Sequence, residues 1–159
     1  MDNEQRQIRL TPEQALSKAQ GTCAYQERCQ QEVRDKLYQW GLHSNDVEDI
    51  IVKLINDNYL NEERFAKAFA GGKFRIKKWG RVKIKLELKK RKVSDYCIKQ
   101  ALKEIDDKAY MLTLKKTIEE RAKKVKQKNP IKRNYLLGQY AISRGFESDL
   151  VWDLLRKFK

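Results

Sequence analysis

The chain has 159 residues and carries 36 lysines and arginines against 22 aspartates and glutamates, a formal net charge of +14 at pH 7. With only 7 glycines and 2 prolines, it has too few turn-forming residues for a β-sandwich or β-barrel, so the composition favours an all-α fold. It has no apolar run near the ~18 residues of a membrane span, no signal-peptide pattern at its start, and 3 cysteines without a disulfide framework. These features predict a cytoplasmic protein.

Signals for nine helices follow one another along the chain. Thr11-Pro12-Glu13-Gln14 is a capping box with proline at the first helical position, and it begins the first helix. The fourth helix opens at Glu63 and Arg64, and Gly71-Gly72 is expected to end it. Apolar spacing and these signals predict helices at residues 12–20, 25–39, 45–57, 63–70, 80–91, 95–105, 107–126, 131–143 and 149–157.

The segment from Val82 to Leu88 allows two interpretations. Its strict alternation of apolar and charged residues has the period of a β-strand. On a helix the same residues form two apolar stripes, Ile84/Leu88 and Val82/Leu86. We predict a helix, because the repeat described next aligns this segment with the helical residues 32–37. We expect its central place in the array to bury both stripes.

The chain repeats itself at intervals of about fifty residues. When Trp40-Gly41-Leu42 is aligned with Arg91-Lys92-Val93 and with Arg144-Gly145-Phe146, the apolar positions that follow coincide. They have the spacing i, i+3, i+4, i+7 of one helical face. Aligned apolar residues include Val47 with Ile98 and Val151, and Leu54 with Ile105 and Phe158; Ser44, Asp95 and Ser148 are the expected N-caps of these helices.

A three-helix unit of this size is marginally stable alone, so neighbouring units are expected to share apolar surface. We predict three tandem, helix-turn-helix-like repeats stacked into an elongated, curved array. The expected repeats are residues 1–58 with a short N-terminal tail, residues 59–105, and residues 106–159.

Positive charge is concentrated after residue 60. Residues 1–60 hold 7 basic and 10 acidic side chains, whereas residues 61–159 hold 29 and 12. Clustered cations repel one another unless an anion neutralises them, so they predict a polyanion or an acidic protein surface as partner; the alternative is a surface that only solubilises the protein. The densest part, the basic strip, consists of Lys73, Arg75, Lys77, Lys78, Arg81, Lys83, Lys85, Lys89, Lys90 and Arg91. A second basic cluster consists of Lys123, Lys124, Lys126, Lys128, Lys132 and Arg133.

The sequence shows no pattern of catalytic or metal-binding residues. It has neither a glycine-rich phosphate loop nor a His-Glu-x-x-His helix. The single histidine, His43, is interpreted as a turn or capping residue, and Cys23, Cys29 and Cys97 as small buried apolar side chains. Trp79, inside the basic strip, is interpreted as a packing residue in preference to a base-stacking one. We therefore expect no catalysis, no metal and no cofactor.

Three phrases of the sequence resemble one protein family. They are Tyr59-Leu60-Asn61-Glu62-Glu63-Arg64-Phe65-Ala66, then Lys73-Phe74, then Lys78-Trp79-Gly80-Arg81-Val82-Lys83-Ile84. Together with weaker matches elsewhere, they resemble the RecX family, bacterial modulators of the RecA recombinase, over nearly the whole chain. One departure is Lys92, which stands where such repeats commonly have the glycine seen here as Gly41 and Gly145.

The resemblance implies an all-helical array that binds the RecA–single-stranded-DNA filament along its groove and suppresses its ATP hydrolysis, strand exchange and co-protease activity. The expected function is a non-catalytic modulator, an inhibitor, of this filament in recombination, DNA repair and the SOS response. The expected partners are RecA and the backbone of single-stranded DNA or another nucleic acid, without sequence preference, and the expected state is a monomer. The alternative is a helix-turn-helix protein that binds DNA directly and acts without RecA.

The distribution of charge bears on how such binding works. In a DNA-reading helix-turn-helix unit, the later helix supplies the base contacts. In the middle repeat that helix, residues 95–105, offers only Lys99, Gln100 and Lys103. We therefore predict that the basic strip contacts phosphates or an acidic filament surface, and that the acidic first repeat contacts protein alone.

Overall fold

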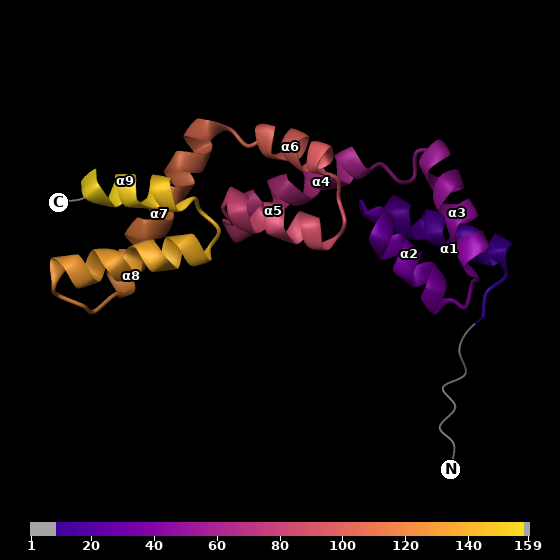
Figure 1. The fold of residues 1–159 in the computed structure, drawn as a ribbon, viewed down its shortest axis with the longest axis horizontal. Coiled ribbons are helices and arrows are strands. Elements are labelled where there is room, and N and C mark those ends of the chain that lie inside the picture. Colours follow the sequence, from indigo (N-terminus) through magenta and orange to yellow (C-terminus); the bar gives the residue numbers. More distant parts are fainter. Residues whose placement is uncertain (1–8, 158–159) are drawn as a thin grey trace, which may run out of the picture.

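The computed structural model describes residues 9–157, which form nine α-helices and one π-helical turn without a β-strand (Figure 1). The predicted all-α fold is confirmed, and residues 82–88 are helical. Phe158, aligned above with Leu54, lies outside the described residues. The elements are α1 (Pro12–Tyr25), α2 (Gln30–Gln39), α3 (Ser44–Asn56), α4 (Glu62–Gly72), η1 (Lys73–Lys77, π-helical), α5 (Arg81–Lys90), α6 (Asp95–Lys103), α7 (Asp107–Lys124), α8 (Pro130–Ser143) and α9 (Ser148–Lys157).

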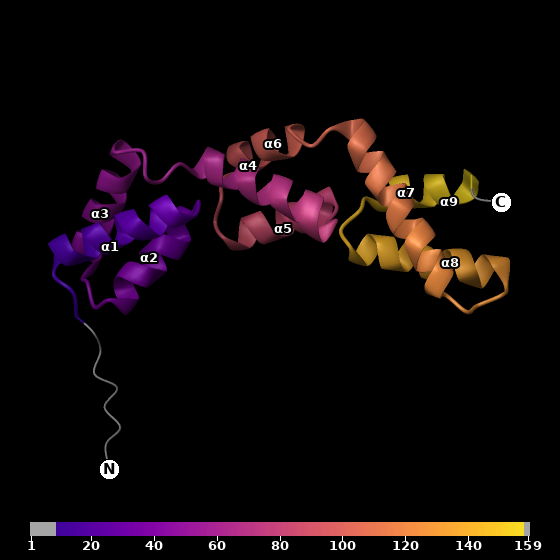
Figure 2. The same ribbon diagram turned by 180° about the vertical axis from the view of Figure 1, so that it is seen from behind.

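The helices form three successive triplets along the long axis of the molecule. In Figures 1 and 2, α1–α3 lie at one end, α4–α6 in the middle and α7–α9 at the other end. Within the triplets, α2 packs on α3, α4 on α6, and α8 on both α7 and α9. This is the elongated array of three-helix repeats that the sequence predicts, and the boundaries after residues 58 and 105 stay predictions.

Each triplet contains the same helix-ending turn, at the position matched by the alignment. Gly41, Lys92 and Gly145 all have a left-handed backbone, with φ of +86°, +58° and +96°. In each case the N–H of the next residue donates to the carbonyl five residues back, as from Leu42 to Leu37 at 3.3 Å, which is the Schellman motif. Lys92 therefore makes the turn that glycine makes in the other repeats, at a strain of about 1 kcal/mol.

The buried side chains form two cores. The first consists of residues from α1–α3 and the chain that follows them to Leu60. The second runs through α4–α6 and α7–α9, where Tyr110 and Phe146 are at most 1% exposed. Among the described residues, its one buried member from the first triplet is Cys29. The second and third repeats are therefore packed as one body.

The predicted N-caps are wrong by one residue. Ser44, Asp95 and Ser148 are the first residues of α3, α6 and α9, not their caps. For α6 the cap is Ser94, whose hydroxyl accepts a hydrogen bond from the Cys97 N–H at 3.2 Å. The cap is the residue whose extended backbone leads into the helix, and residue type alone did not distinguish between two neighbouring candidates.

Two helices also run further than predicted. α1 begins at its predicted capping box and continues to Tyr25, because its buried stripe extends to Cys23. α4 does not stop at Gly71-Gly72, because the chain stays helical there and continues through η1 to Lys78. Burial of Phe74 in the second core stabilises this extra turn, and glycine permits a helix to end without forcing it to.

α5 buries only one of its two apolar stripes. Ile84 and Leu88 are fully buried, whereas Val82 and Leu86 are each 53% exposed. The expectation that both stripes are covered is therefore wrong. The third repeat contacts the beginning of α5 through the turn at Gly145 and leaves the outward face of the helix open.

Candidate polyanion-binding surface

The basic strip runs from η1 to the end of α5 and divides into two groups. The half-buried group is held against aromatic rings: the amines of Lys73 and Lys83 lie 5.0 and 4.5 Å from the centre of a Trp79 ring, and Arg81 and Arg91 lie over Tyr110 and Phe69. Trp79 itself packs against the second core, as predicted. The exposed group, which is open to a partner, consists of Arg75, Lys77, Lys78, Lys85, Lys89 and Lys90.

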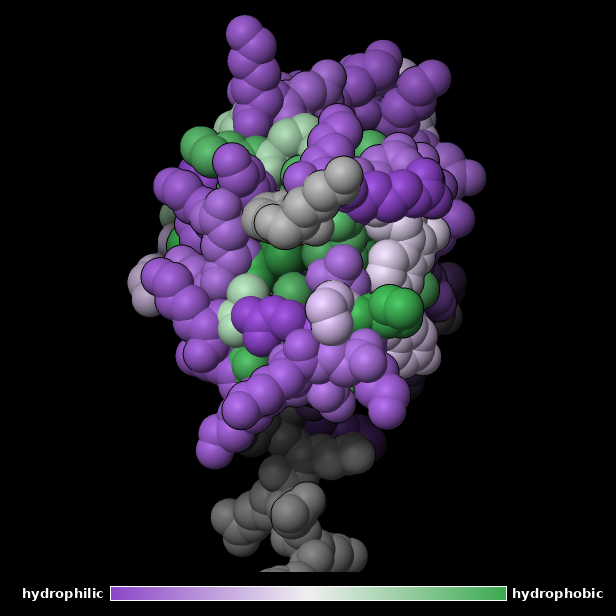
Figure 3. All heavy atoms as spheres, turned by 90° about the vertical axis from the view of Figure 1, so that its left-hand side faces the viewer, coloured by the Kyte–Doolittle hydropathy of each residue, from purple (hydrophilic) through white to green (hydrophobic). Residues whose placement is uncertain are grey.

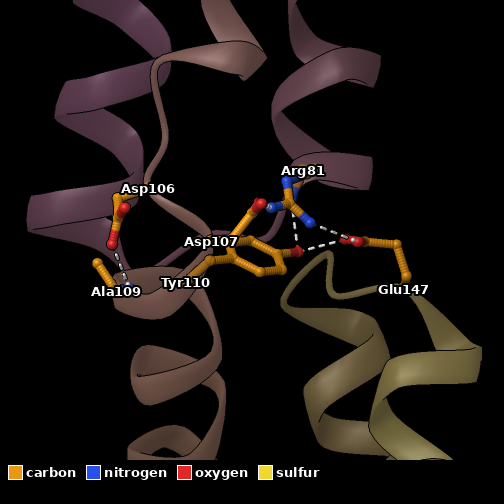
Figure 4. A network of polar contacts seen from close by, with 6 residues as sticks. All are labelled: Arg81, Asp106, Asp107, Ala109, Tyr110 and Glu147. Atoms are coloured by element: carbon orange, nitrogen blue, oxygen red, sulfur yellow. Dashed lines mark hydrogen bonds and ion pairs between the residues drawn. The ribbon is translucent and has the colours of Figure 1, made fainter.

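Arg81 joins the second repeat to the third (Figure 4). Its guanidinium reaches Glu147 Oε2 at 2.9 Å and Asp107 Oδ1 at 2.8 Å, and its backbone N–H donates to the Tyr110 hydroxyl at 3.1 Å. The Tyr110 hydroxyl in turn donates to Glu147. Burial, followed by the Glu147 carboxylate, raises the pKa of Tyr110 above its usual range, so the phenol stays a donor. Arg81 is thus engaged within the protein and not free for a partner.

The backbone supports the same joint and fixes the direction of α5. Gly80 N–H donates to the Arg144 carbonyl and Val82 N–H to the Gly145 carbonyl, both at 2.9 Å. The two segments are so close that a Cβ on Gly80 would lie 2.3 Å from the carbonyl carbon of Gly145. The Arg144 guanidinium donates to the Lys77 carbonyl at the end of η1. The lysines of α5 are therefore displayed from a rigid support.

Arg91 has a corresponding role toward the first repeat. Its guanidinium lies 3.2 Å from Glu87 on its own helix and 3.5 Å from Glu32 on α2. Glu87 also pairs with Lys90 at 3.2 Å, and Lys90 and Arg91 together lower the pKa of this carboxyl. Two of the predicted site residues, Arg81 and Arg91, therefore connect the repeats.

A groove between α5 and α6 brings together lysines of both helices. Its volume is about 790 Å³, and Ile98, Leu102 and Ile105 are among its lining residues. Lys85 and Lys89 line it from α5, and Lys99 and Lys103 from α6. Within residues 9–157, none of these four lysines takes part in an ion pair. We call these four residues the groove lysines.

Two of the three acids that line this groove already have partners within the protein. Asp107 pairs with Arg81, and Asp106 accepts a hydrogen bond from the Ala109 N–H at 2.9 Å as the N-cap of α7 (Figure 4). Asp95 remains, so the groove keeps an excess of positive charge that a polyanion would neutralise.

Lys99 and Lys103 were not part of the predicted site. The signal was present, because they are four residues apart, as are Lys85 and Lys89, and residues with this spacing share one face of a helix. A count of bases along the chain did not identify α6, because it has only two lysines. Both of them line the same groove.

The second basic cluster lies around the turn between α7 and α8, in the end repeat. Its five lysines are exposed, but Arg133 donates to the carbonyls of Val125 at 3.0 Å and Ala122 at 2.6 Å and so closes the C-terminal end of α7. The cations at that helix end also oppose its negative dipole, which is a structural role. Figure 3, which faces this end of the array, shows mostly hydrophilic side chains around a smaller apolar area.

The cysteines behave as packing residues. Cys23 and Cys29 are buried, as predicted, and Cys97 is half-buried. Burial raises the pKa of the Cys29 thiol to about 11 and that of the Cys23 thiol in the same direction, so both stay protonated at neutral pH. Among residues 9–157, no three His, Cys, Asp or Glu side chains are grouped as a metal site would need. The described helices are all too short or too polar to cross a membrane.

The fold and the site define a class: an all-helical repeat protein in which lysines from two helices of the middle repeat line one groove. Two family models match the first and second triplets. The model for RecX, first three-helix domain, matches residues 15–54, and the model for RecX, second three-helix domain, matches residues 61–102. The chain belongs to the RecX family.

Individual relatives agree with the family models. The chain is 30% identical over 145 residues to the regulatory protein RecX of Prosthecochloris aestuarii, covering 86% of this chain and 88% of the relative. It is 29% identical over 135 residues to that of Clostridium perfringens, covering 82% of this chain and 61% of the relative. The chain spans only half the length of the Bacillus cereus relative, at 22% identity over 136 residues.

Two solved structures share the fold. The crystal structure of RecX from Lactobacillus salivarius has a TM-score of 0.83 at 24% identity and covers 92% of this chain and 95% of its own. A crystal structure of regulatory protein RecX has a TM-score of 0.79 at 18% identity, with coverage of 91% and 73%. At these identities, the likeness concerns the fold alone.

Proposed function

We propose that this protein modulates the RecA–single-stranded-DNA filament and lowers its activity, without catalysis and without a cofactor. The observation that carries the proposal is the set of groove lysines on a rigid α5–α6 support, which make no ion pair within the described residues 9–157, in a chain of the RecX regulatory family. A filament is a polymer with repeated anionic surface, and an elongated array is able to follow it over several subunits. The proposed site comprises the groove lysines and the exposed residues Arg75, Lys77, Lys78 and Lys90 of the basic strip.

The structure identifies which lysines a test of this site should replace. Reversing Lys83, Lys85, Lys89 and Lys90 to Glu is expected to weaken filament inhibition strongly, but Lys83 also packs on Trp79. The cleaner variant replaces the four groove lysines by Gln, which keeps helix propensity and removes only charge. The measurement is RecA ATPase activity on single-stranded DNA at increasing concentrations of this protein. We expect the inhibitory midpoint to rise at least about tenfold, since several charge-assisted contacts are lost.

The matched control removes the same number of charges from the second basic cluster, by Lys123→Gln, Lys124→Gln, Lys126→Gln and Lys128→Gln. A smaller effect of this control would show that position and not net charge determines binding. Inhibition by the groove variant at wild-type concentrations would reject the groove as the site. A wild-type protein without effect on RecA would reject the proposed function.

The second candidate is direct DNA binding without RecA, and the excess of bases over acids in residues 61–159 favours it. Neutralising six phosphates of a single strand gives a slope of about −4 in a plot of log affinity against log salt. Tight binding to naked DNA at physiological salt, unchanged by RecA and ATP, would support this candidate. Tight binding that needs RecA and ATP would support the first.

A further inference from the structure

The outward face of α5 carries an apolar pair in the middle of the basic strip. Val82 and Leu86 are four residues apart and each 53% exposed, while Ile84 and Leu88 on the opposite side are fully buried. Because each residue turns a helix by about 100°, Leu86 lies close to the centre of the solvent face and Val82 beside it. We call this pair the α5 crest. Single exposed aliphatic residues are ordinary, but a half-exposed pair on one helix turn of a surface rich in lysine is a candidate contact.

Lysines frame the crest. Lys83, Lys85, Lys89 and Lys90 are its neighbours within one helical turn. Lys83 is held over the Trp79 ring and Lys90 pairs with Glu87, whereas Lys85 and Lys89 extend toward the groove. The α5 crest is therefore a small apolar ridge surrounded by a ring of these four lysines, and it lies next to the groove that the groove lysines line.

A nucleic acid and a protein would contact this surface differently. A phosphate backbone neutralises the ring but offers nothing to cover the ridge, and exposed bases stack on aromatic rings, which the crest lacks. The nearest tryptophan, Trp79, is already packed against Phe69 and covered by Lys73 and Lys83. A protein surface with an apolar depression bordered by carboxylates matches both the ridge and the ring.

We infer that the α5 crest docks on an acidic protein surface, while the groove lysines beside it take the phosphates. This inference rests on the proposed function, in which that protein surface belongs to a RecA subunit of the filament. The outward side of α5 then contacts RecA, and its groove side contacts the DNA phosphates. The protein thereby distinguishes a RecA-coated strand from a bare one. Such discrimination requires a contact that contributes to one target and not to the other.

The test is the double variant Val82→Gln, Leu86→Gln, measured in two assays. In the RecA ATPase assay, we expect the inhibitory midpoint to rise at least about tenfold, as for loss of a central interface contact. In binding of a labelled single-stranded oligonucleotide without RecA, we expect affinity within about twofold of wild type. Lys99→Gln with Lys103→Gln should lower affinity in the oligonucleotide assay.

Control variants separate apolar contact from folding. Leu112→Gln changes a residue of equal exposure, 52%, on α7 and should leave both assays unchanged. Leu86→Met keeps the apolar character and should inhibit like wild type. Circular dichroism and thermal unfolding check that the double variant is folded, which is expected because both positions face solvent.

The outcomes are distinct. Equal loss in both assays would mean that the crest contacts DNA, and no loss in either would mean that it contacts nothing; each overturns the inference. If wild-type protein inhibits RecA and the double variant does so equally, the inference alone fails. If wild-type protein has no effect on RecA, the proposed function fails and the inference with it.

Discussion

The two joints of the array are built from different interactions. The joint between the second and third repeats is a continuous apolar core, reinforced by backbone hydrogen bonds from Gly80 and Val82 and by the buried Tyr110. The joint between the first and second repeats is mainly polar: Arg64 lies 2.5 Å from Glu27, and Arg91 lies 3.5 Å from Glu32. Partly exposed ion pairs rearrange at small cost, whereas a close-packed core does not.

The first joint also contains buried polar atoms that lack a partner within residues 9–157. An open pocket of about 470 Å³ lies there, with Glu27, Arg28, Phe65 and Phe69 among its lining residues. Glu27 Oε2 and Arg28 Nε are buried without a hydrogen-bond partner among the described residues. The acidic first repeat is therefore attached to a rigid body formed by the other two. We expect bending at the first joint and not at the second.

The largest expected effect is that of Tyr110→Ala. Tyr110 is fully buried between the second and third repeats, and its loss leaves a cavity and removes the hydroxyl that donates to Glu147 Oε1, while Oε2 keeps its ion pair with Arg81. We expect the free energy of unfolding to fall by about 3–5 kcal/mol in urea titration. Hydrogen exchange should accelerate in α4–α9 and stay unchanged in α1–α3. Equal acceleration in all nine helices would contradict the division into two bodies.

The next effect is that of Gly145→Ala. Its φ of +96° disfavours a side chain, and a Cβ would lie 2.3 Å from Lys83 Cβ. We expect a loss of about 2–3 kcal/mol in thermal or urea unfolding. The control is Gly21→Ala in α1, where a Cβ meets nothing within 4 Å. This control should gain about 0.5–1 kcal/mol, because alanine favours a helix. Similar stability of both variants would mean that the turn at Gly145 is not tightly packed.

The polar joint should respond weakly. Arg64→Gln combined with Arg91→Gln removes both ion pairs between the first two repeats, and we expect a loss of about 1 kcal/mol or less, since all four side chains are about one-third exposed. Small-angle X-ray scattering should nevertheless show a broader distribution of intramolecular distances. If the free energy of unfolding falls by much more than about 2 kcal/mol and the distribution of distances stays unchanged, the first joint is as stiff as the second, and the prediction is wrong.

The smallest effect is expected for Lys92→Gly. Lys92 has the left-handed backbone, φ +58°, that glycine has at the equivalent positions. Replacing it should relieve strain and raise the free energy of unfolding by up to about 1 kcal/mol. Gly145 and Lys92 occupy the same repeat position, so a loss at Gly145→Ala that exceeds the gain at Lys92→Gly would show that the packed joint adds to the preference of the turn for glycine. Destabilisation by Lys92→Gly would contradict this.

Much of the candidate site was predictable, but not which of its basic residues are open to a partner and which are engaged within the protein. Local charge density identified the basic strip, since that property is written in consecutive residues. The engagement of Arg81 was not predictable, because its carboxylate partners stand 26 and 66 residues further along the chain. Lys99 and Lys103 were missed for the converse reason: their importance comes from the lysines of another helix across the groove.

The sequence by itself determined that residues 9–157 form nine helices with a period of about fifty residues, because helical periodicity acts over a few neighbouring residues. It left the turn at Lys92 open, because glycine is the residue that this turn favours. The tertiary structure alone decided that Gly71-Gly72 continues into a π-helical turn, that Val82 and Leu86 face solvent, and that two repeats share a core. Those outcomes depend on which surfaces meet. Contacts between residues far apart in the chain leave no local pattern, so they are known only once the chain is folded.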